Sequence, residues 1–290
     1  MSNLFKNLKS VSIVSTSQIE NSCANSGQNT LDNENELKMV DNHLELSGQS
    51  IRAQIREYVK KNYEFSPDEY FTEPDTAGEN SKNGKPDIKA DVRVDIFGTM
   101  IPKPKYIRLS PLQVSSAIAI NESTIKRDML VNFNKNSDSQ NNNIVTKNVS
   151  EKDEMLFNYN IRVRDILSED KSTVKDDRLV IENHDYDSEN TLRKKRVAII
   201  LEAIRYLTGF ANQSRNLIDV TPDKILVIFN FKNSDLSFMN YWKDDEITKK
   251  NKLEELNSSD HLVHFIGDNN TENSAYVAWK EAYKFLSELK

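Results

Sequence analysis

The order of the periodic apolar segments constrains the fold of this chain more than any other feature. Residues 11–14 and 157–164 alternate apolar and polar side chains, which is the period of a strand. Residues 50–62 and 191–207 repeat their apolar side chains every three to four positions, which predicts amphipathic helices. Strands are also predicted at residues 92–97, 107–120 and 224–232, and a further helix at residues 273–289. Without the long polar segments, the order is strand, helix, strand, strand, helix, strand.

This order is that of the split βαβ, or ferredoxin-like, arrangement of α+β proteins, in which both helices cover one face of the sheet. RNA-recognition domains lay single-stranded RNA on the face that remains open. Many enzymes share the arrangement, so it does not by itself indicate a function. We expect one domain over residues 1–290, with polar insertions at about 63–91 and 121–153. Residues 165–189 are acidic and are expected to be irregular.

The charge and the cysteine content limit the classes of partner. The net charge of −6, from 39 basic and 45 acidic residues, argues against unspecific binding of polyanions. The charge is uneven, because residues 165–189 hold nine acidic and three basic side chains, so a basic groove elsewhere remains compatible with the sequence. Cys23 is the only cysteine, which excludes an intramolecular disulfide, and no Cys/His spacing indicates a zinc site. The absence of a signal-peptide pattern and of an apolar run of about 18 residues predicts a cytoplasmic protein without a membrane partner.

Two groups of polar residues could bind RNA. Arg52, Arg56 and Lys60 repeat every four residues along the first predicted helix and would form a basic stripe. The alternative is an ordinary solvated face. The loop after the second helix carries amide, hydroxyl and guanidinium donors that can hold phosphates and 2′-hydroxyl groups, at residues 212–216. The alternative there is a plain polar loop behind a helix that Gly209 caps.

Residue patterns that indicate catalysis are scarce. The sequence has no phosphate-binding glycine loop and no nucleophile elbow. His261 and His264 lie three positions apart beside Asp260, which is a weak metal-binding pattern, and in a strand their imidazoles would point to opposite faces. Trp242 and Trp279 could stack on bases, but their apolar neighbours favour the edge of a core. We therefore expect neither a cofactor nor enzymatic activity.

Four segments resemble one protein family. Residues 199–222, IILEAIRYLTGFANQSRNLIDVTP, are similar to a helix and loop of the Cas-seven backbone subunits of type I CRISPR surveillance complexes, in the DevR-type branch associated with subtype I-B. Residues 95–100 (DIFGTM), 108–115 (RLSPLQVS) and 46–56 (LSGQSIRAQIR) resemble three further motifs of that family, in the family's order. Four concordant motifs are much more specific than any one of them.

The resemblance implies a hand-shaped protein with an RNA-recognition-like palm, whose copies stack along the spacer of a CRISPR guide RNA. A hairpin thumb would kink the guide, and target DNA would pair with the exposed guide bases. Residues 121–153 are the thumb candidate and residues 63–91 the finger candidate. The implied partners are the guide RNA, target DNA through the guide, further copies of the chain and other subunits of the Cascade complex.

The candidate RNA-binding residues combine the basic stripe, the loop after the second helix and basic side chains near the matching motifs. They are Arg52, Arg56, Lys60, Lys103, Lys105, Arg108, Arg162, Asn212, Gln213, Ser214, Arg215 and Asn216. Phe210 stands where the family pattern has a second glycine, which leaves that loop less backbone freedom.

The alternative function is an endoribonuclease on the same fold. Related backbone subunits of type III complexes cleave RNA through an acidic residue in a loop, and Asp91, Asp95 or Asp128 could take that role here. Asp95 falls within a predicted strand, where a structural hydrogen bond is the more expected role.

Overall fold

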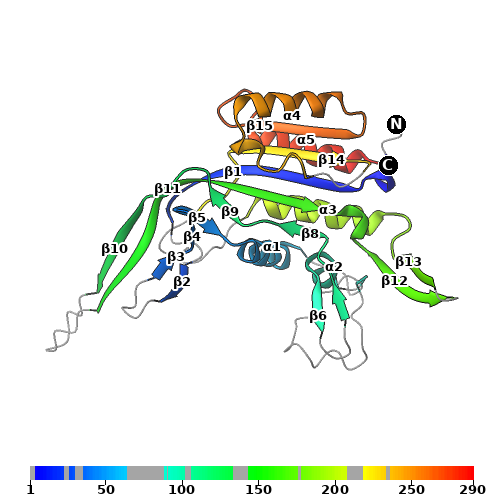
Figure 1. Cartoon of the computed structure of the whole chain (residues 1–290), viewed down its shortest axis with the longest axis horizontal. Helices are drawn as coiled ribbons and strands as arrows, with labels where there is room; N and C mark the ends of the chain where they lie inside the picture. The colour runs from blue at the N-terminus through cyan, green and yellow to red at the C-terminus, as the bar shows by residue number, and fades with distance from the viewer. Residues whose placement is uncertain are drawn as a thin grey trace.

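A large antiparallel sheet forms the centre of the protein (Figure 1). The computed structural model describes residues 4–22, 26–29, 35–63, 88–89, 91–101, 106–132, 143–175, 178–207, 218–232 and 236–290. The central strand β1 (Ser10–Ser22) lies between β11 (Asn143–Ile161) and β14 (Lys224–Asn230) and is antiparallel to both. On the far side of β14 the sheet ends with β15 (Leu262–Asp268). The strands predicted at residues 11–14 and 224–232 are confirmed, although β1 is much longer than predicted. The strand predicted at residues 157–164 is confirmed up to Ile161, where β11 ends, whereas residues 163–165 form a 3-10 helix.

Short strands continue the sheet on the far side of β11. Both β8 (Leu112–Val114) and β9 (Ala117–Ala119) pair with β11, and β9 leads to β5 (His43–Leu46) and β4 (Met39–Val40). The run predicted at residues 107–120 is therefore three short strands, because β7 (Tyr106–Arg108) pairs elsewhere, with β6 (Thr99–Ile101). The mixed composition of helices around one large sheet confirms the α+β class.

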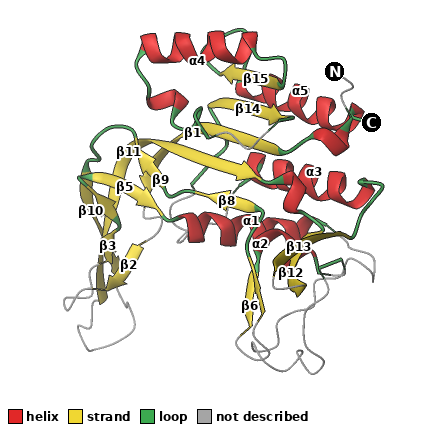
Figure 2. Ribbon diagram, turned by 45° about the vertical axis from the view of Figure 1, so that its right-hand side comes forward, coloured by secondary structure: helices red, strands yellow, loops and turns green. Residues whose placement is uncertain are grey.

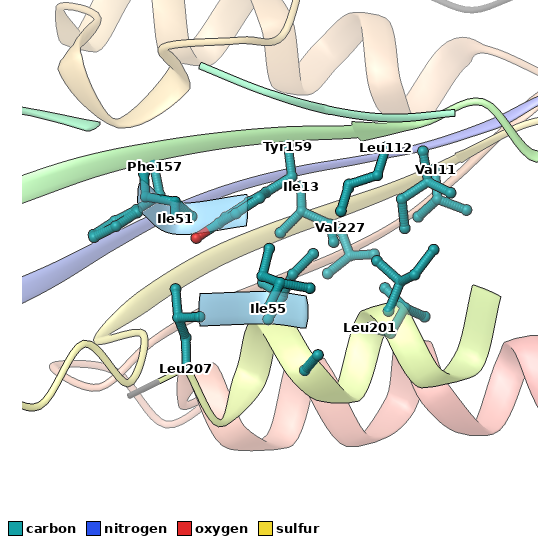
Figure 3. Packing of buried hydrophobic residues seen from close by; sticks show 14 of the residues in the cluster. Val11, Ile13, Ile51, Ile55, Leu112, Phe157, Tyr159, Leu201, Leu207 and Val227 are labelled. Carbon is teal, nitrogen blue, oxygen red and sulfur yellow. The ribbon is translucent and has the colours of Figure 1, made fainter. Parts of the chain in front are cut away.

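Three helices cover one face of this sheet. They are α1 (Gly48–Asn62), α3 (Thr191–Arg205) and α5 (Ala275–Glu288), each within about two residues of its predicted bounds. Ser47 caps α1 by accepting a hydrogen bond from the Ser50 backbone N–H, and Ser274 caps α5 in the same way. The helices bury their apolar stripes against inward-pointing side chains of the central strands, as Figure 3 shows for Ile51 and Ile55 beside Ile13 and Val227.

The other face of the sheet is only partly covered. The short η5 (Tyr241–Lys243) and α4 (Glu246–Ser258) lie over β14, β15 and the edge of β1. Phe238, Tyr241 and Leu256 form a second, smaller core there with Leu226 and Ile228. The indole N–H of Trp242 donates to the backbone carbonyl of Val14 at 3.0 Å, which confirms the predicted position of this tryptophan at the edge of a core. The expectation of a fully open sheet face is therefore wrong for this half of the sheet.

Two segments have a different structure from the predicted one. Residues 92–97 form a helix, α2 (Val92–Phe97), and not a strand. The carboxylate of Asp91 accepts hydrogen bonds from the backbone N–H groups of Arg93 and Val94, which starts the helix, and Gly98 ends it with a φ of 71°. Residues 165–189 are not irregular, because β12 (Ser168–Lys175) and β13 (Arg178–Asp185) pair along their whole length.

Hairpins project from the body of the protein (Figure 2). The thumb candidate at residues 121–153 contains β10 (Ile125–Asn132), which pairs with the first part of β11, while residues 133–142 lie outside the described residues. Beside this hairpin, β2 (Ser26–Asn29) pairs with β3 (Asn35–Leu37), which pairs with β11 at Lys147. Of the finger candidate at residues 63–91, most lies outside the described residues. Two short 3-10 helices complete the fold, η1 (Phe5–Asn7) and η4 (Val163–Asp165).

Candidate nucleic-acid interface

The helices α1 and α2 bring three arginines together. Arg52 and Arg56 lie one turn apart on α1, and Arg93 lies in the first turn of α2. The Arg52 guanidinium donates from Nη2 to the backbone carbonyl of Phe97, and the Arg56 guanidinium lies 5.0 Å from the centre of the Phe97 ring. Arg52, Arg56 and Arg93 are called the α1–α2 basic surface below.

These guanidinium groups repel one another and are partly removed from water. Burial lowers the pKa of Arg52, and the charge of Arg56 lowers it further. Burial also lowers the pKa of Arg56, with a further contribution from Arg93. Both arginines still carry their charge at neutral pH, because the unperturbed pKa of the guanidinium is very high. Burial is the larger cause of both lowered pKa values, repulsion between the arginines adds to it, and the carboxylates of Glu57 and Asp91 raise the pKa of Arg56.

The carboxylates around this surface neutralise only part of the charge. Arg93 forms a salt bridge with Asp91, with 3.4 Å between Nη2 and Oδ2. Within the described residues, neither Arg52 nor Arg56 forms a salt bridge, and the Nε of Arg52 is buried without a hydrogen-bond partner. An anion that accepts hydrogen bonds from the accessible guanidinium N–H groups would compensate the missing negative charge.

The stripe predicted on the first helix is present in the structure. Lys60 lies one further turn along α1 from Arg56, and both side chains are exposed. Sequence reasoning did not find Arg93, because a strand over residues 92–97 gave it no relation to the stripe. A helix cap at Asp91 together with Gly98 after the last apolar residue was the signal that could have identified α2.

Arg108 is not part of an exposed surface, which corrects the expectation that it contacts a guide RNA. Its side chain is 6% exposed and pairs with Asp95, which is fully buried. It also donates to the backbone carbonyls of Asp165 and Ser168, both at 2.9 Å. The structural hydrogen bonds predicted for Asp95 are confirmed, although the residue lies in a helix and not in a strand.

Of the remaining candidate residues, Arg162 alone lies within the described part of the chain. Arg162 follows β11, and its half-exposed guanidinium pairs with Asp165. The other candidates lie outside the described residues, namely Lys103, Lys105, Asn212, Gln213, Ser214, Arg215 and Asn216.

The histidines are not grouped as metal ligands within the described residues. His261 precedes β15 and lies 3.4 Å from Asp260, whereas His264 lies within β15, where burial lowers its pKa. Across the described parts of the chain, no three His, Cys, Asp or Glu side chains come together as metal ligands would.

The uncovered part of the second sheet face carries an amide-lined groove of about 610 Å³. The Asn160 amide donates to Gln113 at 2.7 Å and accepts from the Ser12 hydroxyl at 3.2 Å. At the rim, Asn158 and Asn240 bond each other through side chain and backbone. These amide groups are largely satisfied by one another, and most of the remaining groove wall is apolar, with side chains such as Ile118, Leu156 and Met239.

Comparisons with known proteins bear on the fold and on the family of this chain. No curated protein matches the sequence. Many chains of solved structures match, and two of them align with a TM-score of 0.55 each. One, titled "CRISPR RNA-guided surveillance complex", is 14% identical, and the alignment covers 95% of this chain and 98% of the other. The second, titled "CRISPR RNA-guided surveillance complex, pre-nicking", is 13% identical, with 97% and 100% covered. At these identities the likeness concerns the fold.

Two results bear on the class of protein. Within the described residues, no helix has the length and apolar character that crossing a bilayer requires. The family model "CRISPR-associated negative auto-regulator DevR/Csa2" matches residues 6–228, which include both helices α1 and α3 and the α1–α2 basic surface. Because the match covers well over half of the 290 residues, this chain belongs to the DevR/Csa2 family of CRISPR-associated proteins.

Proposed function

We propose that this chain is an RNA-binding backbone subunit of a CRISPR surveillance complex and that it holds the guide RNA through the α1–α2 basic surface. The observation that carries the proposal is a pair of arginines one helical turn apart, without a salt-bridge partner in the described residues, on a DevR/Csa2 family member. The similar solved structures come from CRISPR RNA-guided surveillance complexes, which supports the same assignment.

The chemistry of the surface suits a phosphate backbone. A guanidinium offers a planar fork of N–H donors that matches phosphate oxygens, and the interaction strengthens where water is partly excluded. A phosphate between Arg52 and Arg56 would also relieve the repulsion that contributes to their lowered pKa values. Contacts to phosphates carry no base preference, so such a surface would hold guides of different sequence alike.

The topology supports an RNA-recognition-like palm. One βαβ unit runs from β1 through α1 to β8 and β9, with β11 between its strands. The other runs from β11 through α3 to β14, with β1 between its strands. Two interleaved units of this kind are the split βαβ arrangement. On this palm, the hairpin of β10 and β11 would act as the thumb, and further copies of the chain would stack along the guide while target DNA pairs with its bases.

A binding role without catalysis is the second part of the proposal. Of the acids considered for RNA cleavage, Asp95 is fully buried and paired with two arginines, and Asp91 caps α2 and pairs with Arg93. Neither is available as a general base. Asp128 is exposed on β10, and no observation gives it a catalytic partner among the described residues.

Purification with a spacer-containing CRISPR RNA tests the proposal. We expect regular multimers that hold intact RNA, seen by native mass spectrometry and electron microscopy. The double variant Arg52→Ala with Arg56→Ala should fail to assemble on the RNA. The matched control removes two exposed lysines at the same spacing on α5, Lys280→Ala with Lys284→Ala, and should assemble normally. Monomers that cleave the RNA, with cleavage lost in Asp128→Asn or His264→Ala, would contradict the proposal and favour the endoribonuclease.

A further inference from the structure

A buried carboxylate lies directly behind the α1–α2 basic surface. Asp95 is 0% exposed, and each of its two carboxylate oxygens accepts from a different guanidinium, Oδ1 from Arg108 and Oδ2 from Arg196. Oδ1 also accepts from the backbone N–H of Leu167 at 2.9 Å. Both arginines are themselves buried, at 6% and 1% side-chain exposure. A buried carboxylate that holds two buried guanidinium groups is costly to assemble, so its geometry is strongly determined by its surroundings.

The two arginines extend this network to distant parts of the chain. Arg196, on α3, donates to the backbone carbonyls of Ile88 and Lys89 at 2.9 and 2.8 Å. Arg108, at the end of β7, donates to the carbonyls of residues 165 and 168, just before and at the start of β12. Asp95 therefore ties α2 to four other segments of the fold: residues 88–89, β7, residues 165–168 and α3.

This network holds α2, a helix that is too short to be stable on its own. The helix α2 has six residues, and helices much shorter than about 12 residues are not stable on their own. Besides the cap at Asp91, the carbonyls of Ile96 and Phe97 accept hydrogen bonds from Ser110 and Arg52. Asp95 supplies the helix's only fully buried ion pairs among the described residues. The last residue of α2 is Phe97, whose ring lies against Arg56 and whose carbonyl accepts from Arg52. The position of α2 thus determines where the two guanidinium groups of α1 are held.

We infer that Asp95 is a positioning residue for guide RNA: it anchors α2 so that Phe97 holds Arg52 and Arg56 in the arrangement that binds phosphate. The inference rests on the proposed function and adds to it a group that never touches the RNA. Without the anchor, the arginines keep their charge but lose the ring and the carbonyl that orient them. Long side chains that must be ordered on binding contribute less to affinity than side chains held in place beforehand.

A double-mutant cycle separates this role from a general contribution to stability. The full-length protein, Asp95→Asn, Arg52→Ala with Arg56→Ala, and the triple variant are each titrated with a labelled spacer-containing CRISPR RNA, and their unfolding midpoints are recorded. Asp95→Asn should weaken RNA binding by about tenfold in the presence of both arginines and leave it unchanged, within about twofold, when they are absent. The matched control is Asp187→Asn, another buried carboxyl, which accepts from the Arg193 backbone N–H and should lower the midpoint without weakening RNA binding.

A second variant tests the same path if Asp95→Asn does not fold. Phe97→Leu keeps the Asp95 network and the carbonyl but removes the ring beneath Arg56. It should weaken RNA binding in the natural chain and have no further effect in Arg56→Ala. Equal losses with and without the arginines, for either variant, would overturn the inference, as would unchanged binding in Asp95→Asn. Normal RNA binding by Arg52→Ala with Arg56→Ala would instead refute the proposed function, which makes the two failures distinguishable.

Discussion

Removal of the Arg52 and Arg56 guanidinium groups is the perturbation whose size the structure predicts best. Arg56 donates to no acceptor among the described residues and rests on the Phe97 ring, so its whole donor set is available to a phosphate. Arg52 already uses Nη2 on the Phe97 carbonyl, which leaves fewer donors. With about 1.5–3 kcal/mol for a hydrogen bond to a charged group, Arg56→Ala should cost about 2–3 kcal/mol of binding free energy and Arg52→Ala about 1–2 kcal/mol.

The dependence of RNA binding on salt gives an independent measure of the same contacts. Each phosphate contact to a single strand contributes about 0.7 to the slope of log affinity against log salt, so loss of two contacts should reduce the slope by about 1.4. Between roughly 50 and 200 mM salt, the difference in affinity between the natural chain and the double variant should therefore shrink by about sevenfold. The assay is fluorescence anisotropy with an RNA short enough to bind one copy of the chain.

Two further double variants show whether a loss of RNA affinity comes from the charge, from the guanidinium geometry or from the position of these side chains on α1. Arg52→Lys with Arg56→Lys keeps the charge, so it should preserve most of the salt slope but lose the affinity that depends on the planar guanidinium. The change on α5, Lys280→Ala with Lys284→Ala, removes the same charge at the same spacing and should leave both quantities unaltered. An unchanged slope in the alanine double variant, or an equal loss in the α5 control, would refute the assignment of phosphate contacts to α1.

The fold and its titrating groups give three smaller predictions. Ser47→Ala removes the N-cap of α1 and should lower the free energy of unfolding by about 1 kcal/mol, measured by urea denaturation. Ile55→Ala leaves a cavity between α1 and the sheet and should cost about 2–5 kcal/mol in the same assay. Burial and the Glu202 carboxylate raise the pKa of Tyr58 to about 12 in the folded state, above the ordinary value of 10.0. The folded state therefore favours the protonated phenol, and stability should fall as the pH rises from about 10 to 12; Tyr58→Phe should flatten that fall, whereas an equally steep fall in Tyr58→Phe would contradict the assignment.

The sequence predicts the elements whose apolar pattern is long. The helices α1 and α3 each have 15 residues and α5 has 14, so several turns repeat the same buried stripe and the bounds follow within about two residues. Residues 92–97 are too short for this. Val92, Val94 and Ile96 alternate as in a strand. The residues that are buried are Val92 and residues 95–97, which is a helical spacing. The sequence does not show this spacing, because it does not show that the charged Asp95 is buried with arginine partners.

The surface of the candidate site was predictable in part for a related reason. Spacing along α1 alone places Arg52 and Arg56 on one face of a helix, and the structure keeps them there. Spacing does not reveal whether an arginine meets a carboxylate from a distant segment. Arg108 has the same side chain and lies in a family-like motif, yet its partner is 13 positions earlier in the chain and buried. The residues next to Arg108 in the sequence do not indicate that pairing. Arg108 was therefore predicted to contact RNA, whereas in the structure it is a buried structural residue.

The family-like motifs at residues 95–100 and 108–115 contact each other and form one structural unit, which explains why these residue types occur together. The Asp95 carboxylate accepts a hydrogen bond from the Arg108 guanidinium, and the Ser110 hydroxyl donates to the Ile96 carbonyl at 2.9 Å. Gly98 has a φ of 71°, and a Cβ at this position would lie 2.5 Å from the Arg108 carbonyl oxygen, so any other residue would push the two segments apart. Gly98→Ala should therefore displace Phe97 from Arg56 as well as strain the turn. Gly98→Ala is compared with the natural chain, and Gly98→Ala with Arg56→Ala is compared with Arg56→Ala alone. If Gly98→Ala weakens RNA binding only when Arg56 is present, the motif serves the guanidinium groups of α1. An equal loss in both comparisons would show that it serves the fold alone.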